Sequence, residues 1–263
     1  MELLIWIIIF CLVGGVLGVF AAALVLLMPV GLRTRTMPHM ISFAIGALLG
    51  AAFLALLPDA LDSPGFKDAH QLTSVALLGI LGFFLLEKTL IWRHCHTETC
   101  EVHGSEQTVV SHHSRGQSGT LVLIGDGIHN FVDGILIAGA FLTDIHLGVV
   151  TSLAVAAHEI PQEVGDFFVL LQSGYSKVRA LWFNVLSGVA TVVGGVLGYF
   201  SLVGAEYVIP YLLTVAASSF IYIAVADLIP GLHHHTEMKM TIQQMLFITA
   251  GVLVIYIAHS TLH

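Results

Sequence analysis

Ligand-type side chains interrupt the apolar chain at residues 158–167, which read HEIPQEVGDF. At 3.6 residues per turn, His158 and Gln162 share one helix face. Three carboxylates continue along the flank of that face: Glu159, Glu163 and Asp166. Pro161 cannot donate to the carbonyl one turn earlier, a break that is tolerated where a helix lines a polar cavity. The stretch therefore predicts a helix with one ligand-lined face.

A second polar stretch, GDGIHNFVDG at 125–134, has the same character. His129 and Asp133 are four residues apart and share a helix face, with Asp126 one turn earlier. Asn130 lies four residues after Asp126, so the polar stripe is broad. The two stretches are expected to lie on neighbouring helices.

The five carboxylates of these stretches have no cation within their own segments, because 119–142 and 147–171 contain neither Lys nor Arg. One carboxylate at mid-membrane costs about 3 kcal/mol, and five cost roughly 15 kcal/mol, which is comparable to the stability of a whole domain. The alternative, that the polar side chains only bond one helix to another, suits one or two residues better than nine. We therefore predict that bound cations or protons supply the missing positive charge.

The ligand types indicate which cation is bound. Imidazole with carboxylate suits Zn²⁺, Fe²⁺, Mn²⁺ or Cd²⁺, whereas Na⁺, Mg²⁺ and Ca²⁺ prefer oxygen alone. Two neighbouring sites with a bridging carboxylate are predicted: His129, Asp133, His158 and Gln162 in the first, and Asn130, Glu159 and Glu163 in the second. These metals are expected as transported ions and not as resident cofactors.

The composition places these stretches in a membrane protein. Of the 263 residues, 57% are hydrophobic and only 10% are charged, and the mean hydropathy is +0.93. Soluble domains have about 25% charged residues, so this chain cannot cover itself with polar surface. A net charge of −8 with fifteen histidines favours cationic partners and not nucleic acid.

Eight apolar runs are long enough to cross a bilayer. They cover 3–29, 39–60, 72–92, 119–142, 147–171, 178–202, 207–229 and 241–261. The first run is expected to be a retained span and not a cleaved leader. Together they predict an all-α integral membrane protein whose residues 1–263 form a single transmembrane domain, with a disordered His-rich cytoplasmic loop at 93–118.

Basic residues indicate the orientation of the spans. Eight of the nine Lys and Arg fall in loops on one side, and Lys67 alone falls on the other. By the positive-inside rule, both termini should face away from the cytoplasm, in a multi-pass protein of the cell (inner) membrane.

A faint internal repeat is also visible. VGGVLG occurs at 13–18 and again at 193–198, and FLALLPD at 53–59 corresponds to VADLIPG at 225–231. Spans 1–3 and 6–8 would then be repeats of opposite orientation around spans 4 and 5, which is a transporter trait. Glycine-rich hexapeptides also recur by chance in membrane helices, so this alternative stays open.

HNFVDG followed by HEIPQEVGD resembles the paired fourth and fifth helices of the ZIP (Zrt/Irt-like protein) family of divalent metal transporters, in the branch with HNxxDG and HExPxExGD motifs. The resemblance implies a binuclear metal centre, movement of metal into the cytoplasm, and eight helices in a 3+2+3 bundle. By position it assigns His129, Asp133, His158 and Gln162 to a first metal site, Asn130 and Glu159 to a second, and Glu163 and Asp166 to acidic positions of the branch. The branch usually has His where this chain has Gln162, and an amide is a weaker ligand.

Other candidate residues lie outside the two motifs. Asp126, Asp166, Asp227 and Asp59 could line the pathway of the ion, although an acid at a helix end is often simply solvated. The loops offer further ligands for transient metal capture, with a solvated linker as the alternative: His94, Cys95, His96, Cys100, His103, His112, His113, His233, His234 and His235.

Three rival functions remain on the sequence alone. HEIPQ nearly makes HExxH, the motif of an intramembrane zinc metalloprotease, but Gln162 replaces the second His and Pro161 breaks the helix. A metal exporter of the cation-diffusion type would have six spans and a soluble tail. A metal-sensing membrane protein without transport is the third. The expected partners are divalent ions and the lipid bilayer, and a homodimer is left open.

Overall fold

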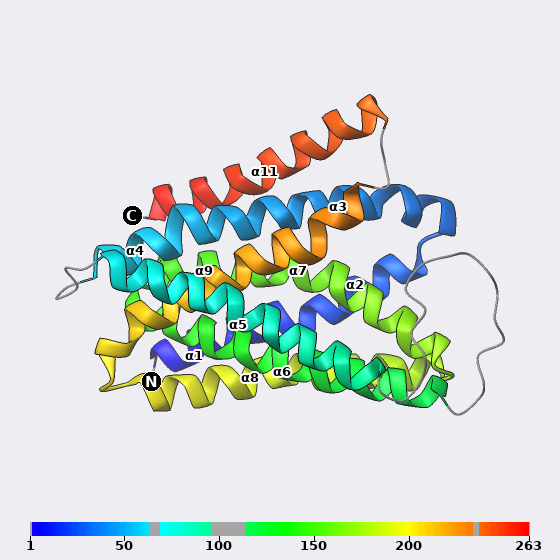
Figure 1. Cartoon of the computed structure of the whole chain (residues 1–263), viewed down its shortest axis with the longest axis horizontal. Helices are drawn as coiled ribbons and strands as arrows, with labels where there is room; N and C mark the ends of the chain where they lie inside the picture. The colour runs from blue at the N-terminus through cyan, green and yellow to red at the C-terminus, as the bar shows by residue number, and fades with distance from the viewer. Residues whose placement is uncertain (1, 64–68, 96–113, 234–236, 263) are drawn as a thin grey trace.

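The protein is described by a computed structural model over residues 2–63, 69–95, 114–233 and 237–262. Helices run nearly side by side in one bundle (Figure 1). Four of them are unbroken stretches that flank or form its centre: α5 (Ala69–Cys95), α6 (Ser114–Thr143), α7 (Ile145–Gln172) and α8 (Lys177–Leu202). A fifth, α11 (Met238–Leu262), covers the outside.

Three further stretches contain a π-helical turn. The first is α1 (Glu2–Cys11), η1 (Leu12–Leu17) and α2 (Gly18–Leu27), and the second is α3 (Val30–Ala51), η2 (Ala52–Leu56) and α4 (Leu57–Leu61). The third begins with the 3-10 turn η3 (Glu206–Val208) and continues as α9 (Ile209–Tyr222), η4 (Ile223–Leu228) and α10 (Ile229–Leu232). Such turns often occur at functional sites of helical proteins.

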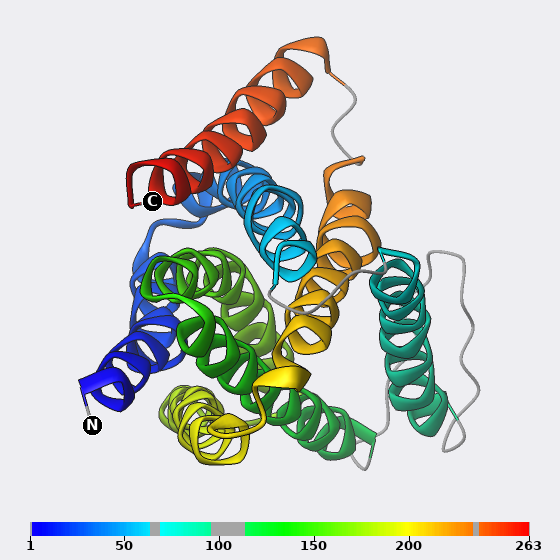
Figure 2. The same cartoon turned by 90° about the vertical axis from the view of Figure 1, so that its left-hand side faces the viewer.

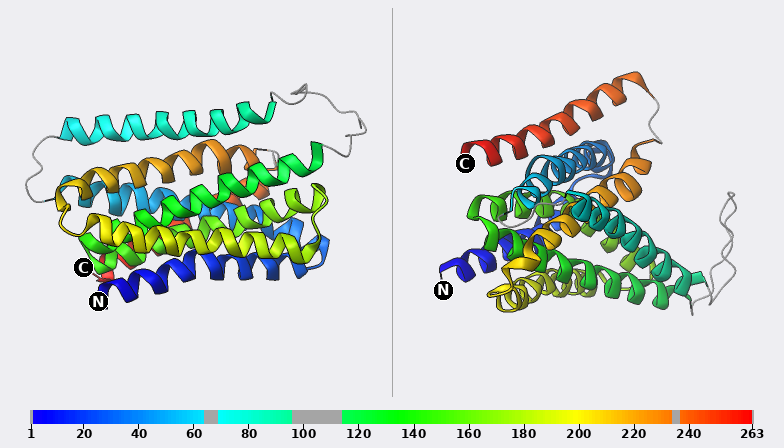
Figure 3. Two further views of the ribbon diagram at one scale, coloured as in Figure 1. Left: turned by 90° about the horizontal axis from the view of Figure 1, so that it is seen from below. Right: turned by 60° about the vertical axis from the view of Figure 1, so that its left-hand side comes forward.

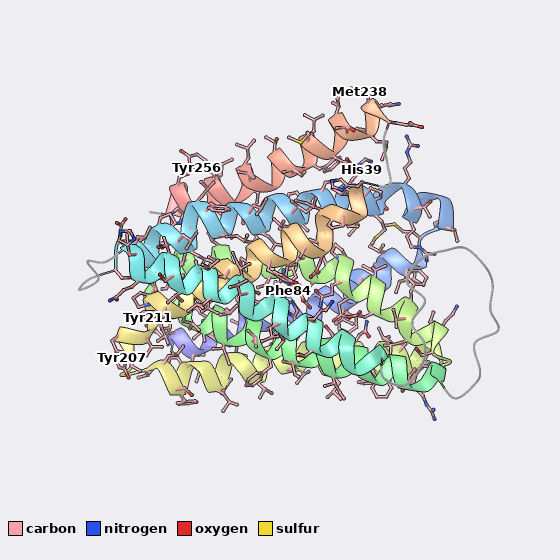
Figure 4. All side chains as sticks on the ribbon, viewed as in Figure 1. His39, Phe84, Tyr207, Tyr211, Met238 and Tyr256 are labelled. Atoms are coloured by element: carbon pink, nitrogen blue, oxygen red, sulfur yellow. The ribbon has the colours of Figure 1, made fainter. Side chains whose placement is uncertain are left out.

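The predicted all-α membrane fold is confirmed. Within the described ranges, six helical stretches are long and apolar enough to span a bilayer, and α6 and α7, which carry the two polar stretches, are not among these six. Large apolar side chains on the outer helices are exposed, as lipid contact requires: Phe84 is 52% exposed and Tyr256 is 54% exposed. Tyr207 and Tyr211 lie at one end of the bundle, where tyrosines commonly anchor a span in the interface (Figure 4).

Both termini lie at the same end of the bundle (Figure 3). The chain positions of eight Lys and Arg, from Arg33 near the start of α3 to Lys239 near the start of α11, all fall at the opposite end. We call this opposite end the basic end. The sequence predicts the second span from residue 39, because Arg33 and Arg35 make the preceding turns too polar for a span. In the structure, α3 begins earlier, at Val30.

The two halves of the chain repeat in structure. Both η2 and η4 are followed by a short helix with proline at its start, Pro58 and Pro230, as the paired sequences at 53–59 and 225–231 indicate. The packing of helices is repeated in the same way. The contact of α3 with α11 corresponds to that of α9 with α5, and the contact of α2 with α7 corresponds to that of α8 with α6. These pairs are those expected for inverted repeats around α6 and α7.

The polar helices α6 and α7 lie in the middle of the bundle (Figure 2). Glycines bring α6 and α8 into backbone contact: a Cβ added at Gly134 would lie 2.0 Å from the Thr191 carbonyl oxygen, and one at Gly194 would lie 2.0 Å from that of Phe131. Small residues allow this close approach in membrane helices. One face of α8 is thereby held against the polar stripe of α6.

Candidate metal centre

A tight reversal of the chain places the two polar stretches at the same depth. Helix α6 ends at Thr143, and the Asp144 side chain caps α7 by accepting hydrogen bonds from the backbone N–H groups of His146 (2.7 Å) and Leu147 (3.3 Å). Because this connection is a single residue, segments equally distant from it must meet. His129 and His158 lie fifteen residues before and fourteen residues after Asp144, and they do meet.

Four ligand-type side chains converge at this meeting point, which we call the first cluster: His129, Asp133, His158 and Glu159. The two Nε2 atoms of the histidines are 3.3 Å apart. His129 Nε2 lies 3.6 Å from Asp133 Oδ2 and 3.7 Å from Glu159 Oε1, and His158 Nε2 lies 3.4 Å from each of the same two oxygens. Three of these side chains are fully buried, and His129 is 22% exposed.

These spacings match those around a tetrahedral ion. A zinc ion with bonds of about 2.1 Å separates its ligand atoms by about 3.4 Å along each edge of the tetrahedron. The five measured distances of the first cluster lie between 3.3 and 3.7 Å. The donor set of two imidazoles and two carboxylates also suits zinc and its neighbours. The first cluster can therefore hold a transition-metal ion with little rearrangement.

The hydrogen bonding of His158 prepares it as a ligand. Its Nδ1 lies 3.1 Å from the Ala154 carbonyl oxygen, which can only accept, so Nδ1 carries the hydrogen. In the neutral ring, Nε2 is then left with a free lone pair, and it faces the carboxylates of Asp133 and Glu159. A lone pair facing a carboxylate is repulsive unless a cation lies between them, so the hydrogen bond from Nδ1 to the Ala154 carbonyl favours metal binding at Nε2.

A second group of carboxylates, Asp126, Glu159 and Glu163, adjoins the first; we call it the second cluster. Their ligand oxygens all lie within 4.8 Å of one another, and each residue is at most 5% exposed. In the described part of the chain, both carboxylate oxygens of Glu159 and Glu163 and Oδ2 of Asp126 lack a hydrogen-bond partner. Buried carboxylates without partners are costly, which points to a cation between them. Glu159 belongs to both clusters and is placed to bridge them.

The structure groups the predicted ligands differently from the helical pattern in two places. Gln162 lies outside the first cluster; its Nε2 is 3.5 Å from Asp126 Oδ1. Asn130 donates to the same oxygen at 3.0 Å, and its own Oδ1 accepts from the Thr191 hydroxyl at 2.7 Å. These amides therefore orient Asp126, and Glu159 lies in the first cluster, where the helical pattern had not placed it.

The remaining candidates lie at various distances from the centre. Asp166 is partly buried and lies in α7, one turn nearer the basic end than Gln162. Asp59 lies in α4 at the end that carries the termini, and Asp227 is in η4 and exposed, so neither joins a cluster. His94 and Cys95 end α5, and His233 follows α10. The other loop candidates lie outside the described residues: His96, Cys100, His103, His112, His113, His234 and His235.

Three polar residues of α8 also reach the centre, although neither of the two sequence motifs contains them. Asn184, Ser187 and Thr191 are 2%, 5% and 0% exposed. Their spacing of three and four residues places them on one helix face, which was a usable signal. This spacing is a weaker signal than the charged motifs of α6 and α7, because neutral polar residues are common in membrane helices and serve mostly in helix packing.

A bundle of apolar helices with a buried, cation-seeking cluster at its centre defines a membrane metal-ion transporter. The comparison with known proteins agrees: residues 92–259 match the family described as "ZIP Zinc transporter". The chain belongs to this family. It is accordingly a transporter and not an enzyme, which excludes the metalloprotease hypothesis, and it is not a member of the cation-diffusion class.

Several curated proteins are similar over most of the chain. Zinc transporter ZIP13 of Pongo abelii is 32% identical over 262 residues, covering 91% of this chain and 74% of the relative. Zinc transporter YKE4 of Saccharomyces cerevisiae is 28% identical, with 82% and 69% covered. Metal cation symporter ZIP14 of Xenopus tropicalis is 27% identical, with 82% and 59% covered.

Proposed function

We propose that this protein carries zinc, and with it Fe²⁺, Mn²⁺ or Cd²⁺, across a bilayer into the cytoplasm through a centre that holds two ions. The observation that carries the proposal is the set of four ligand atoms from His129, Asp133, His158 and Glu159 at 3.3–3.7 Å. The names of the relatives ZIP13 and YKE4, both zinc transporters, support zinc as the main ion. No resident cofactor is needed.

Charge supports two ions over one. The carboxylates of Asp126, Asp133, Glu159 and Glu163 lie buried in the two clusters, and when all four are ionised they carry a formal charge of −4. Their ion-pair contacts within the described ranges are all with histidines, which are metal ligands when neutral. Two divalent ions neutralise four carboxylates, whereas a single ion would leave two buried negative charges uncompensated.

The order of the clusters along the membrane supports inward movement. Helix α6 starts at the basic end, so Asp126 comes before His129, and α7 runs back to that end, so Glu163 lies one turn beyond Glu159. The second cluster is thus about one helical turn nearer the basic end than the first. If the basic end faces the cytoplasm, as the positive-inside rule indicates, an ion moving inward meets the histidines first and the all-carboxylate cluster second.

The same orientation places both termini outside the cytoplasm, and we propose the cell membrane as the location. We also propose that the chain acts as one transporter domain, with the His-rich loop at 93–118 serving capture or regulation of metal on the cytoplasmic side. Labelling of a terminal tag on intact cells tests the orientation: impermeant reagents should reach it. Cross-linking in the membrane distinguishes a homodimer from a monomer.

Reconstitution into liposomes tests the function. Purified protein should drive zinc into vesicles that contain a zinc-sensitive dye, with and without an inward pH gradient. Asp133→Asn removes one ligand charge with little change in shape and should abolish uptake. Asp144→Asn is the matched control, because Asn also caps helices well and this residue lies outside both clusters. No uptake by wild-type protein that is folded and correctly inserted would refute the proposal.

A further inference from the structure

The buried polar residues Asn184 and Ser187 of α8 face the second cluster from a third helix. Asn184 donates from Nδ2 to the backbone carbonyl of Glu163 at 3.2 Å, which fixes the amide beside that carboxylate. Ser187 packs near Gly127, where a Cβ would lie 3.8 Å from its hydroxyl, and interacts with the neighbouring Asp126. Both side chains are therefore held against the acids of the second cluster and not against lipid.

Each of the two side chains has an oxygen that accepts no hydrogen bond. Among the described residues, Asn184 Oδ1 has no partner, and the Ser187 hydroxyl interacts only with Asp126, so its oxygen lone pairs are free, although the residues are only 2% and 5% exposed. A buried serine in a membrane helix usually bonds to a carbonyl of its own helix, as Ser152 does to Gly148 at 2.7 Å. These oxygens lie beside Asp126 Oδ2 and the Glu163 carboxylate, which also lack hydrogen-bond partners among the described residues, and such a group of buried oxygens is costly unless something else binds them.

We propose that Asn184 Oδ1 and Ser187 Oγ are neutral ligands that complete an all-oxygen cation site with Asp126 and Glu163. This inference rests on the proposed function and adds the third wall of its second ion position. The site differs in chemistry from the first cluster, which contains two imidazoles. Oxygen-only sites favour harder divalent ions, so Mn²⁺ suits this position better than Zn²⁺ does.

The difference in ligands has a consequence for movement of the ion. An ion that leaves the two histidines for the oxygen-only site exchanges strong ligands for weaker ones on its way to the basic end. Passage requires that each site bind an ion firmly enough to receive it and weakly enough to release it. Asn184 and Ser187 thus set how readily the second site releases its ion and which metals it accepts.

Equilibrium dialysis of the purified full chain against radioactive manganese and zinc tests the proposal. The double variant Asn184→Leu with Ser187→Ala should weaken manganese binding by about tenfold or more. Binding of the more tightly held zinc ion, at the first cluster, should be retained. Ser152→Ala, which removes a buried serine hydroxyl distant from the acids, should change neither ion. Unchanged manganese affinity in the folded double variant would overturn the proposal.

A gain-of-function variant keeps the test independent of folding defects. Asn184→Asp adds a carboxylate at the same position and should tighten manganese binding by about tenfold. Unchanged or weaker manganese binding in this variant would also overturn the assignment of Asn184. Failure of the proposed function is distinguishable, because wild-type protein would then bind neither metal at the centre and would transport none.

Discussion

Neutralising the shared carboxylate, Glu159→Gln, should weaken both ion positions at once. Glu159 is fully buried, its Oε1 lies 3.4 and 3.7 Å from the two histidine Nε2 atoms, and it also belongs to the second cluster. Gln keeps the shape of the side chain but removes one charge. Three carboxylates then face two divalent ions, which leaves a formal charge of +1 at a buried centre.

An uncompensated buried charge costs about 3–5 kcal/mol. That corresponds to a loss of about 150- to 5000-fold in the affinity for the pair of ions. The variant should therefore bind a single ion, or none, at zinc concentrations that fill both positions in wild type. By contrast, His129→Ala removes a ligand of the first cluster only and should leave the second position able to bind.

Zinc titration calorimetry on the purified protein measures both affinity and stoichiometry. Glu237→Gln, a neutralisation of an exposed glutamate before α11, is the control and should match wild type. If Glu159→Gln binds two zinc ions with affinities within twofold of wild type, Glu159 does not bridge the clusters and the charge argument fails.

Four further outcomes are expected. Replacing His129 or Asp133 with Ala should abolish zinc uptake into liposomes while insertion stays normal; uptake at the wild-type rate in either would remove that ligand from the centre. Gln162→His adds an imidazole beside the acids and should raise zinc affinity and lower the maximal uptake rate. Both quantities should return toward their wild-type values at acid pH, because a ligating His must first lose its proton. Thr191→Val removes a 2.7 Å hydrogen bond to a buried amide and should cost about 1–3 kcal/mol of stability, whereas Thr191→Ser should restore it; equal melting temperatures for all three proteins would count against this bond. Deleting 96–113 should preserve uptake and alter only the loading or regulation of the transporter, and a complete loss of uptake by the folded protein would show that the loop is essential.

Much of the centre could be predicted from the spacing of residues within each helix. His129 and Asp133 are one turn apart, and the acids of 158–167 have no cation in their own segment, so a metal centre between two helices followed from charge alone. The single-residue connection at Asp144 explains why these helices pair at the right depth. Helical periodicity and electrostatic cost were sufficient for these features because both are local properties.

The exact ligand grouping depends on how far each helix is rotated, and that is set by its neighbours. His158 and Glu159 are adjacent in sequence and about 100° apart around α7, yet both reach the first cluster because the Asp133 face of α6 lies between them. A helical wheel favours Gln162, one turn after His158, and cannot include this rotation. Only the packing of α6 against α7 decides between the two residues.

The contribution of α8 had still less support in the sequence. Its polar residues reach the acids because Gly134 and Gly194 allow two backbones to touch, which is a property of the assembled bundle. The π-helical turns η2 and η4 were likewise not predicted, although the paired FLALLPD and VADLIPG sequences mark their positions. Contacts between helices and π-helical turns produce no periodic pattern in a sequence, so they could not be predicted from it.

Anomalous diffraction at the zinc edge from crystals of the zinc-loaded protein tests the two-ion centre most directly. One peak is expected within about 2.1 Å of His129 Nε2, His158 Nε2 and the carboxylates of Asp133 and Glu159. A second, weaker peak is expected on the basic-end side of Glu159, beside Asp126 and Glu163. Zinc located only at the loops or the protein surface, with none between α6 and α7, would contradict a metal centre at the two clusters.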